Sequence, residues 1–324
     1  MNIYIIGSGT FGTAIANSLA QNQNNNVTLY SRSHQIVYDI NQNNINHKYF
    51  PNTKLSANIK ATDNTDRVSE FDIVFLAIPS SAIIKCIYDF KDKISKDQII
   101  VNLSKGIFEN GEIITDYLAN FFNTKNIVSL KGPSFAIEIM ENAKTLLTLA
   151  YSQRSQFDIL SQLFKKTNIF LDSTKDIKGV EILSVVKNIY ALFIGIIDAK
   201  YNSHNTRFMF MTKVFSEIRM LNKYFGGNEN TLFLSCGLGD ACLTSLNDLS
   251  RNRTLGLLIG KGFYESNSKD NTVVIEGLNS INTIYSLIDK NLIINFPILS
   301  KLHFYLNSDE RRFNIDVNEM FNSK

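Results

Sequence analysis

The stretch of sequence that decides the fold is residues 1–12, MNIYIIGSGTFG. Residues 2–6 form a short apolar run, which is typical of a strand buried on both faces of a parallel sheet. The run leads directly into Gly7-Ser8-Gly9-Thr10-Phe11-Gly12, a G-x-G-x-x-G pattern, and then into Thr13–Ala20, which is predicted to be a helix. Because this pattern indicates dinucleotide binding when it lies between a strand and a helix, we expect a dinucleotide-binding fold.

Each glycine of this pattern has its own expected role. Gly7 makes the tight turn, Gly9 lets the backbone approach a pyrophosphate, and Gly12 lets the helix pack close to the strand. The start of the helix would offer unpaired N–H groups and a positive dipole end to the phosphates. The alternative is a glycine-rich loop without a ligand, and the strand–turn–helix context argues against it.

Composition restricts the class of protein further. The 324 residues carry 33 basic and 30 acidic side chains, and the lysines are dispersed, so a small anion is a better partner than nucleic acid. Cys86, Cys236 and Cys242 form no CxxC pair, which favours a reducing compartment, the cytoplasm. The histidines lack ligand spacing, so we expect no metal site. The chain begins with a strand and no apolar run approaches the length of a membrane span, so we expect neither a signal peptide nor a span.

The first half of the chain alternates between short strands and helices. Strands are predicted at residues 2–6, 27–30, 72–78, 98–103, 126–130, 145–150 and 168–171. This alternation predicts an α/β domain over residues 1–173, with a doubly wound (Rossmann-type), mostly parallel sheet. Helices without a convincing strand follow at residues 177–197, 206–224, 255–264 and 281–287. The second domain, residues 174–324, is therefore predicted to be all-α.

The loops expected at the carboxyl ends of the strands are rich in Gly, Ser, Pro and basic residues, a composition suited to anions. Ligands of doubly wound sheets bind at those ends. The loop Ser31-Arg32-Ser33 follows the second strand, where NAD-preferring folds place an acid. Arg32 is instead available for a 2′-phosphate, so we expect NADP or NAD as cofactor, with NADPH used. A solvated loop arginine is the alternative.

Nine short motifs occur in a fixed order along both halves of the chain. They are GSGTFG at Gly7, NHKYFPNTKL at Asn46, AIPS at Ala77, LSKGI at Leu103, LKGPSFA at Leu130, VKN at Val186, CGLGD at Cys236, SRNR at Ser250 and VIEG at Val274. In this order and spacing they resemble the bacterial-type NAD(P)-dependent glycerol-3-phosphate dehydrogenases, over nearly the whole chain. The resemblance implies interconversion of dihydroxyacetone phosphate and sn-glycerol 3-phosphate, which feeds phospholipid synthesis. It also implies a helical C-terminal half, residues 174–324, that binds the substrate and carries the catalytic residues, and, commonly, a homodimer.

The resemblance implies roles for individual residues as well. Cofactor contacts are implied at Gly7, Gly9, Thr10, Phe11, Gly12, Arg32, Tyr49, Lys105, Ala136, Arg251, Val274 and Glu276, of which Tyr49 is the looser match. Substrate contacts are implied at Lys105, Gly132, Ser134, Lys187, Asp240, Ser250, Arg251 and Asn252. Lys187 falls on the family's catalytic lysine, and Asp240 is assigned to the catalytic pair with it.

Several positions depart from the family pattern. Leu183-Ser184 stands where the family usually has a glycine pair, and Tyr201–His204 where it has a glycine-rich turn. Asn279 and Asn282 replace residues that are usually basic. The departures concern packing around the catalytic helix and cofactor affinity, and they leave the catalytic positions intact.

Lys187 also stands out without the resemblance, because it interrupts the apolar stretch 182–193. A lysine there must either reach water along its stem or have a partner, and Asp240 in the Gly-Leu-Gly-Asp turn is a plausible one. A nearby carboxylate favours the charged lysine and keeps a proton ready for the reduction of a ketone. A purely structural salt bridge is the alternative. His204 lies in a polar loop and is expected at the surface.

The segment Ser250-Arg251-Asn252-Arg253 predicts a phosphate site. Ser250 is expected to be the N-cap of a helix over residues 251–260. Arginines in a first turn face the positive end of the helix dipole, which is unfavourable unless an anion binds there. A bound phosphate would receive the helix N–H groups, the Ser250 hydroxyl and the Arg251 fork, whereas two solvated arginines are the alternative.

A second helix start is expected at Gly132-Pro133-Ser134, with Pro133 in its first turn and Ser134 holding substrate hydroxyls. Two other functions stay open at this point. A related dehydrogenase acting on 3-hydroxy acids usually spaces its lysine and asparagine apart, whereas Lys187 and Asn188 are adjacent. A nucleotide-binding sensor would need no proton donor, and Lys187 with Asp240 argues against it.

Overall fold

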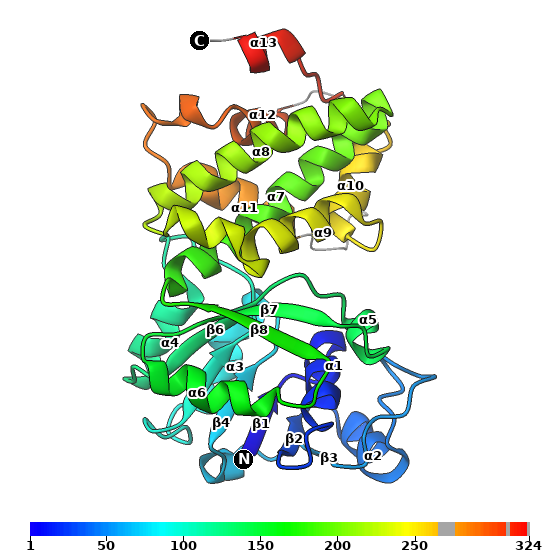
Figure 1. Cartoon of the computed structure of the whole chain (residues 1–324), viewed down its shortest axis with the longest axis vertical. Coiled ribbons are helices and arrows are strands. Elements are labelled where there is room, and N and C mark those ends of the chain that lie inside the picture. The colour runs from blue at the N-terminus through cyan, green and yellow to red at the C-terminus, as the bar shows by residue number, and fades with distance from the viewer. Residues whose placement is uncertain (265–275, 309–311, 323–324) are drawn as a thin grey trace.

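The structure is a computed structural model that describes residues 1–264, 276–308 and 312–322. An eight-stranded sheet with its helices forms one half of the molecule, and a stack of helices forms the other (Figure 1). The strands are β1 (Asn2–Ile6), β2 (Asn26–Tyr30), β3 (Ile59–Thr62), β4 (Ile73–Leu76), β5 (Ile99–Asn102), β6 (Ile127–Lys131), β7 (Thr145–Ala150) and β8 (Ile169–Thr174). The predicted fold class is confirmed.

The strand order in the sheet is β3-β2-β1-β4-β5-β6-β7-β8. Neighbouring strands are parallel except β6 and β7, which run antiparallel. The sequence-based prediction missed β3, because it is only four residues long at the sheet edge and buries only Ile59 and Ala61. The other strands match their predicted positions to within two residues at each end, apart from the end of β8 at Thr174.

Helices cover both faces of the sheet, and alternate residues of each strand pack against them. Ile3 and Ile5 of β1 belong to the core on one face, whereas Tyr4 and Ile6 belong to the core on the other. Side chains of successive strand residues point to opposite faces, so an uninterrupted apolar run is what a strand covered on both sides requires. The covering helices are α1 (Thr10–Leu19), α2 (His34–Asn43), α3 (Ile83–Tyr88), α4 (Ile114–Phe122), α5 (Ala136–Met140) and α6 (Arg154–Leu163), with short 3₁₀ turns η1 (Asp66–Glu70) and η2 (Ser80–Ala82).

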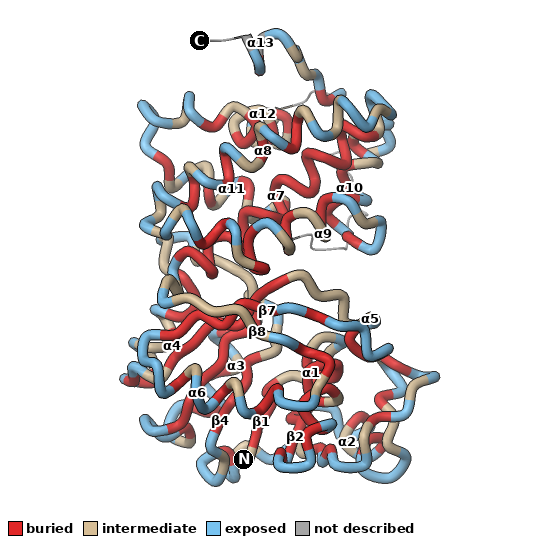
Figure 2. Tube along the Cα trace, viewed as in Figure 1, coloured by how far each residue is buried: buried red, intermediate tan, exposed pale blue. Residues whose placement is uncertain are grey.

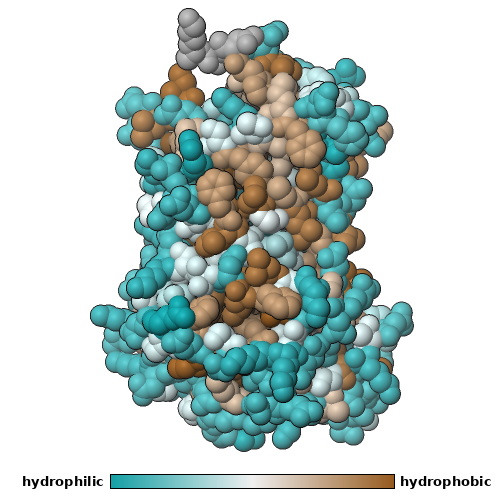
Figure 3. All heavy atoms as spheres, in the orientation of Figure 1, coloured by the Kyte–Doolittle hydropathy of each residue, from teal (hydrophilic) through white to brown (hydrophobic). Residues whose placement is uncertain are grey.

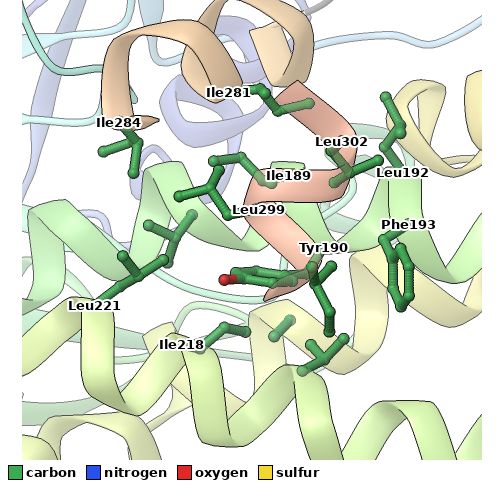
Figure 4. Close-up of a cluster of buried hydrophobic side chains, with 14 of the residues drawn as sticks. Ile189, Tyr190, Leu192, Phe193, Ile218, Leu221, Ile281, Ile284, Leu299 and Leu302 are labelled. Atoms are coloured by element: carbon green, nitrogen blue, oxygen red, sulfur yellow. The ribbon is translucent and has the colours of Figure 1, made fainter. Parts of the chain in front are cut away.

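The helical half is built around α7 (Ile177–Tyr201), which packs against five of the other described helices of this half. The remaining helices are α8 (His204–Tyr224), α9 (Asp240–Leu246), α10 (Arg251–Gly260), α11 (Glu276–Ser286), α12 (Pro297–Leu306) and α13 (Val317–Asn322), with short turns η3 (Glu229–Phe233), η4 (Ser235–Gly239) and η5 (Ile293–Asn295). Gly256 of α10 lets this helix cross α7 closely, since a Cβ there would lie 2.0 Å from the carbonyl oxygen of Leu192. Figure 4 shows Tyr190 of α7 enclosed by Ile218, Leu221 and Leu299 from α8 and α12.

The expectation that no apolar run approaches the length of a membrane span was wrong for α7. This helix has 25 residues with a mean hydropathy of 1.9 in its most apolar window, so by length and composition it could cross a membrane. Every residue of that window is buried inside the protein, and Figure 2 shows α7 as a buried segment among the other helices. The apolar composition of α7 therefore reflects its place at the centre of the helical half.

Candidate active site

The strand order reverses direction next to β1, whose neighbours are β2 and β4, and the glycine turn lies at the carboxyl end of β1. Gly7 has φ 117°, and a Cβ there would lie 2.4 Å from the carbonyl oxygen of Ala77. A Cβ at Gly12 would lie 2.0 Å from the carbonyl oxygen of Gly7, whereas a Cβ at Gly9 would face open space. The three glycines thus have the backbone geometry expected of a dinucleotide turn, and their contact with a cofactor stays a prediction.

The first turn of α1 is suited to hold phosphate. Gly9 is the N-cap in an extended conformation, with no side-chain cap and no acidic residue in the first turn. The leading N–H groups of a helix have no carbonyl partner within it, so they remain available to an anion. The helix begins at Thr10 and not at the predicted Thr13, because Phe11 and Gly12 already form part of its first turn. The residues present therefore fit the pyrophosphate of a dinucleotide.

A cavity of about 420 Å³ lies between this edge of the sheet and the helical half. The predicted site residues that line it are Gly9, Thr10, Phe11, Lys105, Ser134 and Ala136 from the first half and Lys187, Asp240, Ser250, Arg251 and Asn252 from the second. A second hollow of about 370 Å³ adjoins it and shares Lys105 and Arg251. The two halves of the chain therefore build one site together.

Lys187 and Asp240 form the charged centre of the cavity. Lys187 Nζ pairs with Asp240 Oδ1 and also donates to Thr244 Oγ1 at 3.0 Å. Lys105 Nζ lies 3.4 Å from the other oxygen of Asp240, so one carboxylate bridges two lysines. Asp240 is 1 % exposed and follows the π-helical turn η4, a type of irregularity that often marks functional sites.

Burial lowers the pKa of Lys187 to about 7, because removing an ammonium from water disfavours its charged form. The negative charge of Asp240 opposes this shift, and the positive charge of Lys105 reinforces it. A group that titrates near neutral pH is well matched to moving a proton in either direction.

The two arginines of the SRNR segment have different surroundings. Ser250 is the N-cap of α10 as predicted, and its Oγ accepts from the backbone N–H of Arg253. Arg253 is buried away from the cavity, where it pairs with Asp198 and with Asp248. Arg251 is exposed and lines the cavity, and within the described residues it has no hydrogen-bond or ion-pair partner. The alternative of two solvated arginines is wrong for Arg253, and only Arg251 is placed to meet an anion.

Some predicted cofactor residues lie outside the cavity. Arg32 is an exposed residue beyond the end of β2, and it makes no polar side-chain contact within the described ranges. Next to it, the hydroxyls of Ser8 and Ser31 bond at 2.8 Å and join this loop to the glycine turn. Tyr49 is half-buried against the core under α1, with Lys48 Nζ 5.5 Å from its ring centre.

Two further predicted residues are only partly described. Val274 lies outside the described residues, and Glu276 is the first residue of α11, whose side chain is outside the described part. The neighbouring Gly277 donates its N–H to Asn252 Oδ1 at 3.1 Å, so the start of α11 is held against α10 beside the cavity.

The prediction for the Gly132-Pro133-Ser134 segment was wrong in one respect. The helix α5 begins at Ala136, with Phe135 as its N-cap, so Pro133 lies in the preceding turn. Gly132 has φ 153°, and Ser134 Oγ donates to the Gly132 carbonyl oxygen at 3.1 Å. The turn between the end of β6 and the start of α5 carries Ser134 and places it at the cavity wall.

Sequence analysis missed several polar residues of the site. Thr244 lies one helical turn after Asp240, a spacing that puts both on one face of α9. Asn188 lines the cavity beside Lys187. Lys131 and Glu181 form a buried ion pair behind the cavity. The sequence signal for each of them was only that a charged residue stands next to or within an apolar run.

A mostly parallel sheet with a dinucleotide turn, facing helices that supply a buried lysine and aspartate, is the arrangement expected of an NAD(P)-dependent dehydrogenase. Residues 2–157 match the N-terminal part of the family described as NAD-dependent glycerol-3-phosphate dehydrogenase, and residues 176–312 match its C-terminal part. The chain belongs to this family, which confirms the resemblance seen in the nine motifs.

Individual relatives agree with this assignment. The chain is 35% identical to a glycerol-3-phosphate dehydrogenase [NAD(P)+] of Clostridium botulinum, covering 93% of this chain and 91% of that protein. A protein of the same name from Orientia tsutsugamushi is 36% identical, over 89% of this chain and 88% of its own length. The crystal structure of glycerol-3-phosphate dehydrogenase from Coxiella burnetii is similar with a TM-score of 0.84 at 28% identity, covering 96% of this chain and 95% of that one.

Proposed function

We propose that this protein interconverts dihydroxyacetone phosphate and sn-glycerol 3-phosphate with NADPH or NADH. The observation that carries the proposal is the buried Lys187–Asp240 pair, which opens on the same cavity as the cationic Lys105 and Arg251. A proton donor beside an anion-binding surface is what reduction of a phosphorylated ketone requires. Relatives over most of the chain bear the name of this activity.

Lys187 is the proton donor in ketone reduction and the acceptor in the reverse reaction. Bound NAD(P)H supplies the hydride. The Lys187 ammonium gives its proton to the carbonyl oxygen as negative charge develops there, and Lys187 becomes a neutral amine. Asp240 and Thr244 hold Nζ in place during this change, while the charge of Lys105 stabilises the same oxygen.

The substrate phosphate binds at the start of α10. Arg251 lines the cavity there without a partner in the described structure, and Asn252 lies next to it. The Ser250 oxygen accepts from its own helix, so its hydroxyl hydrogen remains free to donate to phosphate. Ser134 lines the cavity, and its hydroxyl donates to the Gly132 carbonyl oxygen. These two residues would hold the substrate's hydroxyl group.

The residues that would hold the cofactor lie at the carboxyl edge of the sheet. The N-terminus of α1 at Gly9 would hold its pyrophosphate, and Arg32 would meet a 2′-phosphate. The remaining predicted contacts come from Gly7, Thr10, Phe11, Gly12, Tyr49, Lys105, Ala136, Arg251, Val274 and Glu276. Because no acid follows β2, NADPH is used at least as well as NADH.

The chain divides into a cofactor domain, residues 1–173, and a substrate domain, residues 174–324. The hydrophobic core of the helical half is a cluster distinct from the two cores that flank the sheet, and it takes only Ile113 and Ala150 from the buried residues of the first half, which supports this division. The connection between β8 and α7 is only two residues long, and the proposed boundary lies one residue before the end of β8.

The protein forms a homodimer in the cytoplasm. Hydrophobic residues gather on the face shown in Figure 3, and exposed side chains of the helical half include Phe208 at 56% and Phe233 at 70%. Exposed apolar surface of this kind is typical of protein interfaces. The three cysteines are free thiols, as expected in a reducing compartment, where the product would feed phospholipid synthesis.

The decisive experiment follows the absorbance of NADPH and of NADH with and without dihydroxyacetone phosphate. We expect oxidation of the cofactor only when the phosphorylated ketone is present, with glycerol 3-phosphate as the product. Unphosphorylated dihydroxyacetone serves as the control and should react far more slowly. A purified, folded protein that oxidises neither cofactor with the phosphorylated ketone would contradict the proposal.

A further inference from the structure

A second buried lysine lies behind the cavity, and the proposed mechanism does not use it. The side chain of Lys131, the last residue of β6, is fully buried. Its Nζ donates to the carbonyl oxygens of Asn102 at 3.0 Å and Ser104 at 2.7 Å, and it lies 3.1 Å from Glu181 Oε1. An ammonium has three N–H donors, and these three acceptors satisfy all of them, so the side chain is held in one place.

Glu181 connects Lys131 to the helix that carries Lys187. Its carboxylate accepts from Ser129 Oγ at 2.5 Å and from Asn102 Nδ2 at 2.9 Å, in addition to its contact with Lys131. Glu181 lies on α7, less than two turns before Lys187. The network therefore joins β5, β6 and α7 directly behind the site.

The same network holds the backbone that precedes Lys105. The Ser104 N–H donates to Asn102 Oδ1 at 3.0 Å, and the Ser104 carbonyl oxygen accepts from Lys131 and from Asn102 Nδ2. The Ser104 hydroxyl donates to the Ile78 carbonyl oxygen at 2.6 Å. With every polar group of Ser104 bonded, the starting point of the Lys105 side chain has little freedom.

A buried ion pair is weak evidence for stability, because desolvation of both charges offsets their attraction. What this pair does specifically is to place the Ser104 carbonyl. We propose that Lys131 is a positioning residue: locked onto Glu181, it holds the loop before Lys105 and so places the Lys105 ammonium opposite Asp240 and Lys187. This inference deepens the proposed function and rests on it for its kinetic test.

The kinetic test compares two backgrounds, the native Lys105 and Lys105→Met. Lys131→Met alone leaves Glu181 as an unpaired buried charge and is strongly destabilising, so the main variant is the double Lys131→Met/Glu181→Gln, with thermal unfolding checked by circular dichroism. With native Lys105, we expect kcat/KM for dihydroxyacetone phosphate to fall about 10- to 100-fold, because Lys105 is misplaced. In the Lys105→Met background, the same double change should lower kcat/KM less than about threefold. The Lys131–Glu181 pair acts through the position of the Lys105 ammonium, so its loss matters little once that ammonium is absent.

The exposed ion pair Arg67–Glu70 offers a matched control on the sheet half. Arg67→Met/Glu70→Gln should leave kcat/KM unchanged in both backgrounds. Equal losses from the Lys131/Glu181 change in both backgrounds would mean that the pair acts on the whole fold and not through Lys105. No loss with native Lys105 would also overturn the proposal.

A second measurement does not require catalysis. Trace acetylation with acetic anhydride, read by mass spectrometry, reports the accessibility of Lys105 relative to the exposed Lys96. In Lys131→Met/Glu181→Gln we expect Lys105 labelling to rise severalfold toward that of Lys96, whereas Arg67→Met/Glu70→Gln should not change it. Unchanged labelling would refute positioning by Lys131. Absence of turnover in the native protein would contradict the proposed function instead, and the labelling would still decide the role of Lys131.

Discussion

The sheet half and the helical half face the same cavity with different chemistry. Apart from the Lys105 ammonium, the sheet half presents mainly backbone, through the close turn of Gly7 and Gly12 and the uncapped N-terminus of α1. The helical half presents charged side chains, namely Lys187, Asp240 and Arg251. Backbone groups bind features that all dinucleotides share, whereas side chains decide which substrate reacts and where the proton goes. Substitutions in the helical half should therefore have the larger kinetic effects.

The largest effect is expected for Lys187→Met, which keeps the length and apolar stem but removes the proton donor. Turnover should fall by about 100- to 10,000-fold, the usual range for a general acid, with nucleotide affinity nearly unchanged. Steady-state kinetics and NADPH titration by fluorescence measure the two quantities. Lys200→Met, at the exposed end of the same helix, is the control and should behave like the native protein. Near-native turnover of a folded Lys187→Met would assign the proton transfer to another group.

The pH dependence of the native protein tests the same residue without substitution. Burial lowers the pKa of Lys187 to about 7, so the ammonium is lost as pH rises through that value. Because ketone reduction needs the ammonium, its kcat/KM should fall as pH rises above about 7. Alcohol oxidation needs the neutral amine, so its kcat/KM should rise over the same interval. Profiles that move in the same direction for both reactions would contradict Lys187 as the shared group.

A smaller loss is expected for Arg251→Ala, which removes the planar cation at the start of α10. The loss of kcat/KM for dihydroxyacetone phosphate should correspond to about 2–4 kcal/mol of transition-state stabilisation, because the phosphate loses its charged partner. Discrimination against unphosphorylated dihydroxyacetone should fall with it, since that contact exists only with the phosphate. Arg251→Lys should recover part of the loss, because an ammonium cannot offer the guanidinium fork.

Arg253→Ala is a demanding control for this prediction, because the two arginines are two residues apart. Arg253 holds Asp198 and Asp248 away from the cavity, so its loss should lower stability without changing the preference for the phosphorylated ketone. Steady-state kinetics with both ketones, together with thermal unfolding, separate the two variants. If Arg251→Ala kept the native preference, the phosphate would have to bind elsewhere.

The two halves also differ in how far the sequence predicts them. The glycine turn and the buried strands were predictable, because Gly7 and Gly12 are dictated by local sterics and apolar runs by burial on both faces. β3 was not predictable, because four residues at the sheet edge are too few to show a clear alternation of apolar and polar side chains. The pairing of Lys187 with Asp240 was predicted because a lysine in an apolar stretch requires a partner.

Contacts between distant segments were the part that could not be predicted. Lys131 and Glu181 are 50 positions apart in the sequence, and only the packing of β6 against α7 brings them together. Likewise, nothing local distinguishes Arg251 from Arg253, since both lie in one helical turn. Arg253 is buried and Arg251 is exposed because Arg253 pairs with Asp198, which lies near the C-terminal end of α7.

Among the side chains of the sheet half that would contact only the cofactor, the clearest effect is expected at Arg32. Arg32→Ala should raise the KM for NADPH by about 10- to 100-fold and leave that for NADH almost unchanged, because only NADPH loses a charge-assisted contact of about 1.5–3 kcal/mol. Arg67→Ala is the control, because Arg67 is an exposed arginine of the sheet half that lies on η1 and pairs with Glu70. Equal changes for both cofactors would show that Arg32 does not distinguish them.

The smallest effect concerns a buried carboxylate of the helical half that has no role in the chemistry. Glu217 is fully buried and accepts from Tyr190 at 2.9 Å and from the backbone N–H of Ile298 at 2.8 Å. No lysine or arginine among the described residues forms an ion pair with it. Burial raises its pKa from 4.5 to about 7, so between these values the folded protein holds a proton that the unfolded chain has lost.

Glu217 should therefore make the protein less stable as pH rises from about 4.5 to 7, because the unfolded state binds fewer protons there than the folded state. Glu217→Gln removes this titration, and the fall in unfolding free energy over the interval should shrink by on the order of 1–3 kcal/mol. Urea unfolding at pH 5 and pH 8 measures it. Glu229→Gln, whose carboxylate is exposed beside Arg219 and Lys223, should keep the native pH dependence. If Glu217→Gln also kept the native pH dependence, Glu217 would be ionised in the folded protein. The helical core would then tolerate a buried carboxylate without a lysine partner, whereas the buried carboxylate of Asp240 at the cavity has two.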